Sequence, residues 1–165
     1  LLTLRMPGFS LTREEAVCIV SLMRLVHYPA SATLFSAGDA ENAAYMLMVL
    51  EGDVSVDTGA VGRGPRVDIS VMGPGSMLGE LSLIDGSPRS ATCTAVSAVT
   101  AAGLSAGGFQ RLAEQFPKVA FKLAVYIARV AADRLRALTE QLQMYDQITN
   151  SLQTELDLLR GQVRR

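Results

Sequence analysis

The stretch Gly75–Thr92, GSMLGELSLIDGSPRSAT, decides the fold, because we predict that it closes over a phosphate and that the rest of the chain supports it. Residues 79–83 can form one short helical turn, and the backbone N–H groups at the start of such a turn attract an anion. Arg89 follows at a distance from which its guanidinium can grip phosphate oxygens through two hydrogen bonds. A phosphate would repel Glu80 unless this carboxylate accepts hydrogen bonds from hydroxyl groups of the same ligand, so Glu80 suits a ribose.

Residues 79–92, GELSLIDGSPRSAT, resemble the phosphate-binding cassette of the cyclic-nucleotide-binding domain family. Bacterial catabolite activators, regulatory subunits of cyclic-AMP-dependent kinases and nucleotide-gated channels share this cassette. The order Gly-Glu-aliphatic-small-aliphatic, a short loop and then Pro-Arg-small-Ala-Thr is specific when it is present whole. Two differences are mild: Leu78 stands where an aromatic residue is common, and Ser82 where alanine is frequent. Neither difference removes a proposed ligand contact.

The resemblance extends outward from the cassette and covers roughly residues 10 to 140. The stretch LFSAGDAENAAYMLMVLEGDVSV, residues 34–56, is similar to the first strands of the family, with Gly38-Asp39, Tyr45 and Gly52 at its turn and core positions. The resemblance therefore implies an α+β fold: an antiparallel β-roll, or jelly-roll-like barrel, flanked by helices and followed by a long C-terminal helix.

The resemblance also implies a ligand, a purine nucleoside cyclic 3′,5′-monophosphate, with no metal and no other cofactor. Arg89 would pair with the phosphate, and Glu80 would accept a hydrogen bond from the ribose 2′-OH. Ser90 would serve either the phosphate or a guanine in the syn form, so the choice between cAMP and cGMP stays open. The ligand-binding residues implied within the cassette are Gly79, Glu80, Leu81, Ser82, Arg89, Ser90 and Ala91.

The base of the ligand is often covered, in this family, by the long helix that follows the strands. Here that helix offers Arg136, which could stack on the purine or hydrogen-bond to it, and Thr139, which could hydrogen-bond to its edge. Which of the two contacts the base is left open.

The composition indicates a globular protein of one ordinary domain with an appendage. Hydrophobic residues make up 49% of the 165 residues and charged residues 19%, and the net charge of −1 gives no general attraction for nucleic acid or acidic membranes. Cys18 and Cys93 are expected to be packing residues in a reduced, cytoplasmic setting. His27 is the only histidine. A cupin-like sugar or metal barrel, which draws on several histidines, is therefore disfavoured.

Apolar runs such as residues 43–50 are much shorter than the roughly 20 residues that a membrane span requires, so we expect no contact with a membrane. Residues 1–8 suggest a linker, and a helix is predicted from Leu11 to Val26 with Ser10 or Thr12 as its N-cap. From residue 28 to about 105, short apolar runs separated by turn residues predict an all-β region, with residues 59–65 as a hairpin loop. The expected strands are residues 33–35, 44–51, 52–58, 66–72, 90–95 and 99–104.

Two helices are predicted after the strands: a short one at residues 107–116, and a long one that begins at Pro117 and continues to about Arg160. The second half of the long helix has apolar residues in alternating steps of three and four, which is typical of a coiled-coil seam. We therefore expect a homodimer joined along residues 135–160, after a ligand-binding domain at residues 1–140. The seam residues are Leu135, Leu138, Leu142, Tyr145, Thr149, Leu152, Leu156 and Leu159.

Three functions fit these observations. The first is a regulatory sensor module that binds cAMP or cGMP and transmits the change through its C-terminal helix, without enzymatic activity. The second is a truncated transcription regulator of the catabolite-activator type, but only about 26 residues follow Thr139 and they continue the heptad, so no DNA binding is expected. The third is a coiled-coil scaffold with an unused pocket. The chain begins with Leu1, so it could be a piece of a longer protein with an effector domain.

Overall fold

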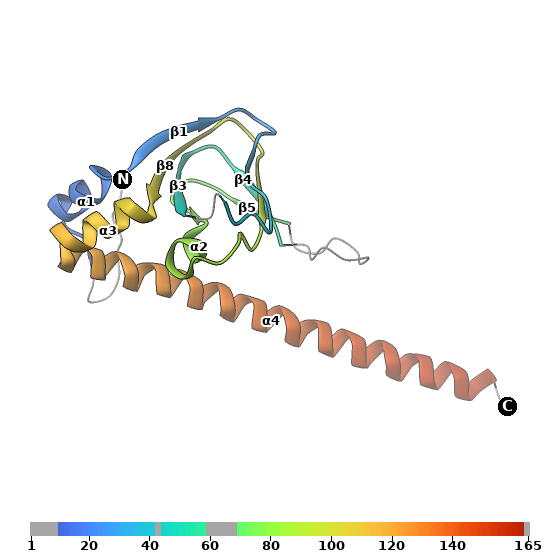
Figure 1. Ribbon diagram of the computed structural model, residues 1–165. Helices are drawn as coiled ribbons and strands as arrows, with labels where there is room; N and C mark the ends of the chain where they lie inside the picture. The colour runs from blue at the N-terminus through green and yellow to red at the C-terminus, as the bar shows by residue number, and fades with distance from the viewer. Residues whose placement is uncertain (1–9, 42–43, 59–68, 164–165) are drawn as a thin grey trace. The chain divides into compact units, whose positions relative to one another are not determined.

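The computed structural model describes residues 10–41, 44–58 and 69–163, with side chains described as far as residue 154 (Figure 1). The chain divides into two units, Leu1–Ile127 and Ala128–Arg165. The elements, in order, are α1 (Arg13–Val20), β1 (Arg24–Tyr28), β2 (Thr33–Phe35), β3 (Tyr45–Glu51), β4 (Val54–Asp57), β5 (Ile69–Met72), β6 (Met77–Leu78), α2 (Glu80–Asp85), β7 (Thr92–Ala95), β8 (Val99–Ser105), α3 (Ala106–Gln115) and α4 (Pro117–Val163).

The described strands form two four-stranded antiparallel sheets. One sheet has the order β1-β8-β3-β6 and the other β2-β7-β4-β5. The predicted α+β fold of antiparallel strands flanked by helices, with a long C-terminal helix, is confirmed. Within the described part of the chain, however, the two sheets remain separate and do not close into a barrel.

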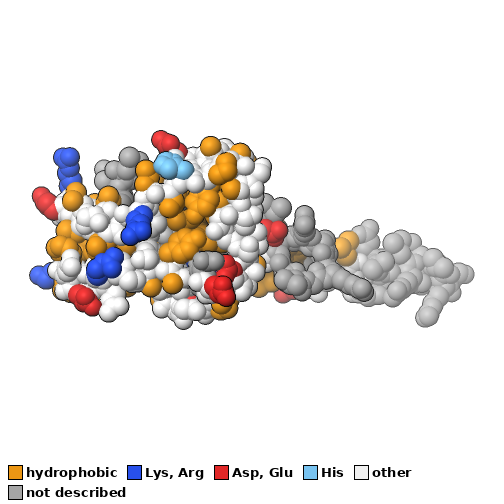
Figure 2. Space-filling model, turned by 45° about the horizontal axis from the view of Figure 1, so that its top comes forward, with side chains coloured by type: hydrophobic (Ala, Val, Ile, Leu, Met, Phe, Trp, Pro, Cys, Tyr) orange, Lys and Arg blue, Asp and Glu red, His pale blue; other side chains and the backbone are white. Residues whose placement is uncertain are grey.

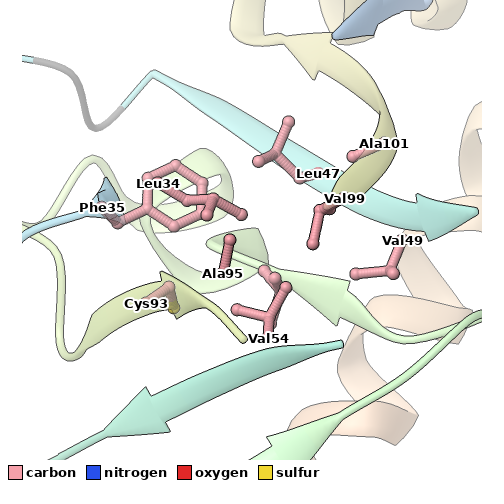
Figure 3. Packing of buried hydrophobic residues seen from close by; sticks show 10 residues of the cluster. Leu34, Phe35, Leu47, Val49, Val54, Cys93, Ala95, Val99 and Ala101 are labelled. Atoms are coloured by element: carbon pink, nitrogen blue, oxygen red, sulfur yellow. The ribbon is translucent and has the colours of Figure 1, made fainter. Parts of the chain in front are cut away.

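The hydrophobic core lies between the two sheets. Figure 3 shows side chains of β3 and β8 pointing toward side chains of β2, β4 and β7. Burying these apolar side chains is the main favourable contribution to folding of this unit. Cys93 belongs to this core, as the sequence predicts for a packing residue. The core cluster consists of Leu34, Phe35, Leu47, Val49, Val54, Leu78, Cys93, Ala95, Val99 and Ala101.

Helix α1 is shorter than predicted. Thr12 caps its N-terminus in a capping box with Glu15, but the helix ends at Val20 and not at Val26. The predicted end is wrong because residues 24–28 form β1, which pairs with β8. Pairing with a neighbouring strand here outweighs the helical pattern of the local sequence.

The predicted strands match the observed ones within about two residues at each described end, and residues 33–35 match β2 without change. Two strands were not predicted. These are β1, whose residues 24–26 the sequence assigns to a helix, and β6, which has only two residues and lies directly before the cassette. The predicted linker at residues 1–8 and the hairpin loop at 59–65 lie outside the described residues.

Helices α1 and α4 are joined within the first unit by Lys122. Its Nζ lies 2.6 Å from Oε1 of Glu15 and 3.2 Å from the carbonyl oxygen of Ser10. Glu15 also accepts a hydrogen bond from the backbone nitrogen of Thr12. One carboxylate therefore caps α1 and fixes it to the start of α4.

The second unit consists of the remainder of α4. Leu135, Leu138, Leu142, Tyr145 and Leu152 are exposed in the single chain. On another face of the helix, Asp133 forms ion pairs with Arg129 and Arg136. The predicted long C-terminal helix is confirmed. Its pairing with a second helix in a coiled coil stays a prediction. No helix in the described residues is long and apolar enough to cross a membrane.

Candidate ligand-binding site

Backbone hydrogen bonds fix Arg89 in the loop between α2 and β7. Its backbone nitrogen donates to the carbonyl of Asp39 at 2.9 Å, and its carbonyl accepts from the nitrogen of Gly38 at 2.8 Å. Gly38 and Asp39 belong to the turn after β2. The end of the cassette is therefore attached to the other segment of sequence that carries the family resemblance.

The guanidinium of Arg89 is buried, with only 4% of the residue exposed. Nη1 donates to the carbonyl of Gly79 at 3.0 Å, and Nη2 donates to the carbonyl of Tyr45 at 2.7 Å. The guanidinium carbon Cζ lies 3.8 Å from the ring centroid of Phe35 and 4.8 Å from that of Tyr45. Both ends of the cassette and two strands of different sheets thus meet at one cation.

Burial lowers the pKa of Arg89, because removing the guanidinium from water penalises its charged form. The nearby side chains of Tyr45, Cys93 and Asp39 act in the opposite direction. Arginine remains protonated through such shifts because its usual pKa is so high. The site therefore holds a buried positive charge.

Glu80 is the first residue of α2 and is 1% exposed. Ser82, two residues further along the chain, is also buried, whereas Leu81 is exposed. Two buried residues of opposite charge in one cassette exclude the simplest non-functional interpretation of Arg89 and Glu80, a surface ion pair with little effect on stability.

Gly79 precedes α2 with a left-handed backbone, at φ 72°. A Cβ atom at this position would lie 3.1 Å from Cζ of Phe35, and still closer to the guanidinium of Arg89. Glycine is therefore required here both for its backbone conformation and for the space it leaves.

The structure describes the other predicted site residues as follows. Ser90 is exposed and Ala91 is half-buried, beside Arg89. Arg136 and Thr139 belong to the second unit, where Arg136 pairs with Asp133 at 2.6 Å and Thr139 donates to the carbonyl of Leu135 at 2.9 Å. Contact of either residue with a base stays a prediction.

Two contributions to the site were not predicted from the sequence: the ring of Phe35 and the carbonyl of Tyr45. Both residues lie in the stretch 34–56 that resembles the family, and Tyr45 was assigned only a turn or core position. The contact between the Phe35 ring and Arg89 leaves no pattern in a single sequence, because these two residues are 54 positions apart.

Charged side chains do not gather into one patch on the face of the molecule that Figure 2 shows; acidic and basic groups are scattered among apolar and polar ones. The described residues also contain no cluster of three or more metal-ligating side chains. The notable charges are instead the two that are buried, Arg89 and Glu80. A buried cation and a buried carboxylate within one short segment are typical of a domain that binds a small molecule.

Comparison with known proteins assigns the chain to a family within this class. The family model "Cyclic nucleotide-binding domain" matches residues 25–116, more than half of the chain. The chain belongs to the cyclic nucleotide-binding domain family, and the resemblance noted in the sequence is confirmed.

Individual relatives agree with this assignment. The chain is 31% identical over 134 residues to the cyclic AMP receptor protein of Thermus thermophilus, covering 81% of this chain and 59% of that protein. It is 35% identical over 102 residues to a cyclic nucleotide-gated potassium channel of Mesorhizobium japonicum, covering 62% of this chain and 26% of the channel. A solved cyclic nucleotide-binding domain from Methylobacillus flagellatus has 30% identity and a TM-score of 0.67, covering 76% of this chain and 69% of that one. The chain thus spans only part of these curated relatives.

Proposed function

We propose that this chain is a regulatory sensor module that binds cAMP or cGMP through its cassette and transmits the change through α4. The observation that carries the proposal is the buried guanidinium of Arg89, which donates hydrogen bonds to the carbonyls of Gly79 and Tyr45. Arg89 lies in the same cassette as Glu80, which is also buried. A cyclic phosphate carries one negative charge, which a guanidinium pairs with through charge-assisted hydrogen bonds.

Glu80 would accept a hydrogen bond from the ribose 2′-OH. Glu80 is almost fully shielded from water, and a ligand that lacks this hydroxyl would lose a hydrogen bond to a charged acceptor, at a cost of about 1.5 to 3 kcal/mol. The site would therefore prefer ribonucleotides. Ser90, which is exposed next to Arg89, would serve either the phosphate or a guanine, so the proposal includes both cAMP and cGMP.

Transmission is proposed to follow α4 because this helix belongs to both units. Its first turns carry buried Val119, Ala120, Leu123 and Ile127 in the first unit, and it continues without a break to Val163 in the second. A shift of these first turns would move the rest of a continuous helix. The exposed apolar residues of the second unit would bury against the same residues of a second copy, in a parallel homodimer.

Titration calorimetry of the purified chain with cAMP and with cGMP tests the binding proposal. We expect a dissociation constant in the micromolar range or below for at least one of them. Linear 5′-AMP and 5′-GMP serve as control ligands, and chromatography of the recovered cyclic nucleotide should show that it is unchanged.

Arg89→Gln should weaken this binding at least tenfold, because losing one partner of a buried charge pair costs about 2 to 5 kcal/mol. Arg111→Gln, at an exposed arginine of α3, is the matched control and should bind as the unchanged chain does. Equal affinity of the two variants would contradict the site. No binding of either nucleotide by the unchanged chain would favour the coiled-coil scaffold.

A further inference from the structure

We propose that Phe35 and Tyr45 are positioning residues for the ligand's anionic group. Their rings hold the guanidinium of Arg89 in one orientation, and this fixed orientation sets the affinity of the site for the cyclic nucleotide. The inference rests on the proposed function of the cassette. It adds a role for two residues that lie outside the cassette, on β2 and β3.

The two rings form one cluster with the guanidinium. Their centroids lie 5.3 Å apart with the ring planes at 47°, and Cζ of Arg89 lies within 5 Å of both centroids. Phe35 is only 4% exposed and belongs to the core between the sheets, so its ring has a fixed place. A cation within about 6 Å of a ring centroid is attracted by the negative face of the ring.

Stacking on a ring and binding an anion use different parts of a guanidinium. The guanidinium is planar and all five of its N–H donors lie in its plane. Two of these donors serve the carbonyls of Gly79 and Tyr45, which limits rotation within the plane. The carbon Cζ lies over the two rings, and this attraction uses none of the N–H donors, so it does not compete with hydrogen bonds to a phosphate.

The fixed orientation of the guanidinium matters because this group is desolvated. Arg89 is only 4% exposed, and this burial lowers its pKa because the charged guanidinium has lost contact with water. Cation–π attraction is strongest for a desolvated cation. Without the ring of Phe35, the guanidinium would populate several orientations, and the apparent affinity would fall with the fraction that can accept the ligand.

Two changes at position 35 test the inference, with calorimetry of cAMP and cGMP as the measurement. Phe35→Leu removes the ring, and 3,4,5-trifluorophenylalanine at this position keeps the shape but withdraws electrons from the ring face. We expect Phe35→Leu to weaken binding about tenfold, the loss that corresponds to one cation–π contact, and the fluorinated variant to weaken it in the same direction. A purely structural role predicts that the fluorinated variant binds like the unchanged chain.

One further variant serves as a control. Val54→Ala reduces packing in the same core and should lower the unfolding temperature while the affinity stays the same. If Val54→Ala lost as much affinity as Phe35→Leu, core packing and not the ring face would set the affinity, and the inference would be wrong.

Nuclear magnetic resonance of the ligand-free chain separates this inference from the proposed function. The Nε–H signal of Arg89 should be shifted by the ring current of Phe35 and should show slow rotation about the Nε–Cζ bond, and both effects should disappear in Phe35→Leu. A freely rotating Arg89 in the unchanged chain overturns the inference, as does unaltered affinity in the fluorinated variant. A held Arg89 in a chain that binds neither nucleotide contradicts the proposed function instead.

Discussion

Nη1 of Arg89 occupies the space that a side chain at position 79 would need: a Cβ atom on Gly79 would lie 2.1 Å from it. The same glycine supplies the carbonyl to which Nη1 donates. The residue that begins the cassette and the arginine near its end therefore depend on each other. Any change at Gly79 should act on Arg89 before it acts on the rest of the fold.

Gly79→Ala should weaken cyclic-nucleotide binding at least tenfold. The guanidinium is the end of a flexible side chain and can move away from the new Cβ, but it then loses its contacts with the Gly79 carbonyl and with Phe35. The left-handed backbone adds a cost of about 1 to 2 kcal/mol to folding. Calorimetry measures the affinity, and urea unfolding measures the free energy of unfolding.

Gly86→Ala is the matched control for this variant. Gly86 ends the same helix with φ 69°, but a Cβ atom there would have no neighbour within 4 Å. It should therefore lose a similar amount of stability and keep its affinity. Loss of affinity in both variants would show that backbone strain, and not the space for Arg89, explains the effect.

Glu80→Gln should reduce the preference of the site for ribonucleotides over 2′-deoxynucleotides. The amide keeps the volume of this buried side chain but replaces one of its acceptor oxygens with a donor. Titrations of cAMP and 2′-deoxy-cAMP, or of the cGMP pair, into both chains give the ratio of affinities. An equal loss for both ligands would mean that Glu80 has a different role.

The contact between α1 and α4 should depend on pH. The pKa of Glu15 is lowered, first by its hydrogen bond with Lys122 and then by that with the backbone of Thr12. A carboxyl group whose pKa is lower in the folded state stabilises the fold above its unfolded pKa, about 4.3, and loses this contribution as the pH falls through the folded value. Unfolding curves of the unchanged chain and of Glu15→Gln should therefore converge as the pH is lowered from 7 to 3.

Lys122→Met should likewise lower the unfolding temperature at pH 7 and reduce the difference between pH 7 and pH 3. Lys118→Met, at an exposed lysine one helical turn earlier, is its control and should change neither. The same pH dependence in Lys122→Met as in the unchanged chain would place the effect on other carboxyl groups, such as that of Asp85, whose pKa is also lowered.

The chain should be a dimer that Leu142→Glu combined with Leu152→Glu converts to a monomer. Both leucines lie on the predicted seam and are exposed in the single chain, and a charge at a core position of a coiled coil opposes association. Light scattering of this variant, of the control Gln143→Glu and of a chain ending at Leu135 provides the measurement. A monomeric unchanged chain, or a dimeric shortened one, would show that the seam does not join two subunits.

Much of the fold was predictable because turn residues and apolar runs mark local structure. Short-range chemistry explains the N-cap, predicted at Ser10 or Thr12 and found at Thr12, as well as Pro117 at the start of α4 and the limits of β2. Strand β1 was not predicted because it depends on a segment that is distant in the sequence. Residues 24–28 become a strand by pairing with residues 99–103. One sequence contains no record of that pairing.

The cassette was predictable for the same local reason, since Gly79, Glu80 and Arg89 lie close together in sequence. Burial of Arg89 was not, because the groups that enclose it come from β2 and β3. The number of buried neighbours around a charge depends on how the sheets pack. A sequence pattern can therefore identify a binding residue and still miss what holds it.

Arg89 and Glu80 are only 4% and 1% exposed, and this shielding should limit the rate at which a ligand associates with them. A ligand can contact them only after neighbouring atoms move, so at high ligand concentration the rate of association should reach the rate of that opening and rise no further. Release would require the same opening. A sensor of the proposed kind would therefore respond to the average concentration of its ligand over the lifetime of the complex, and not to shorter fluctuations.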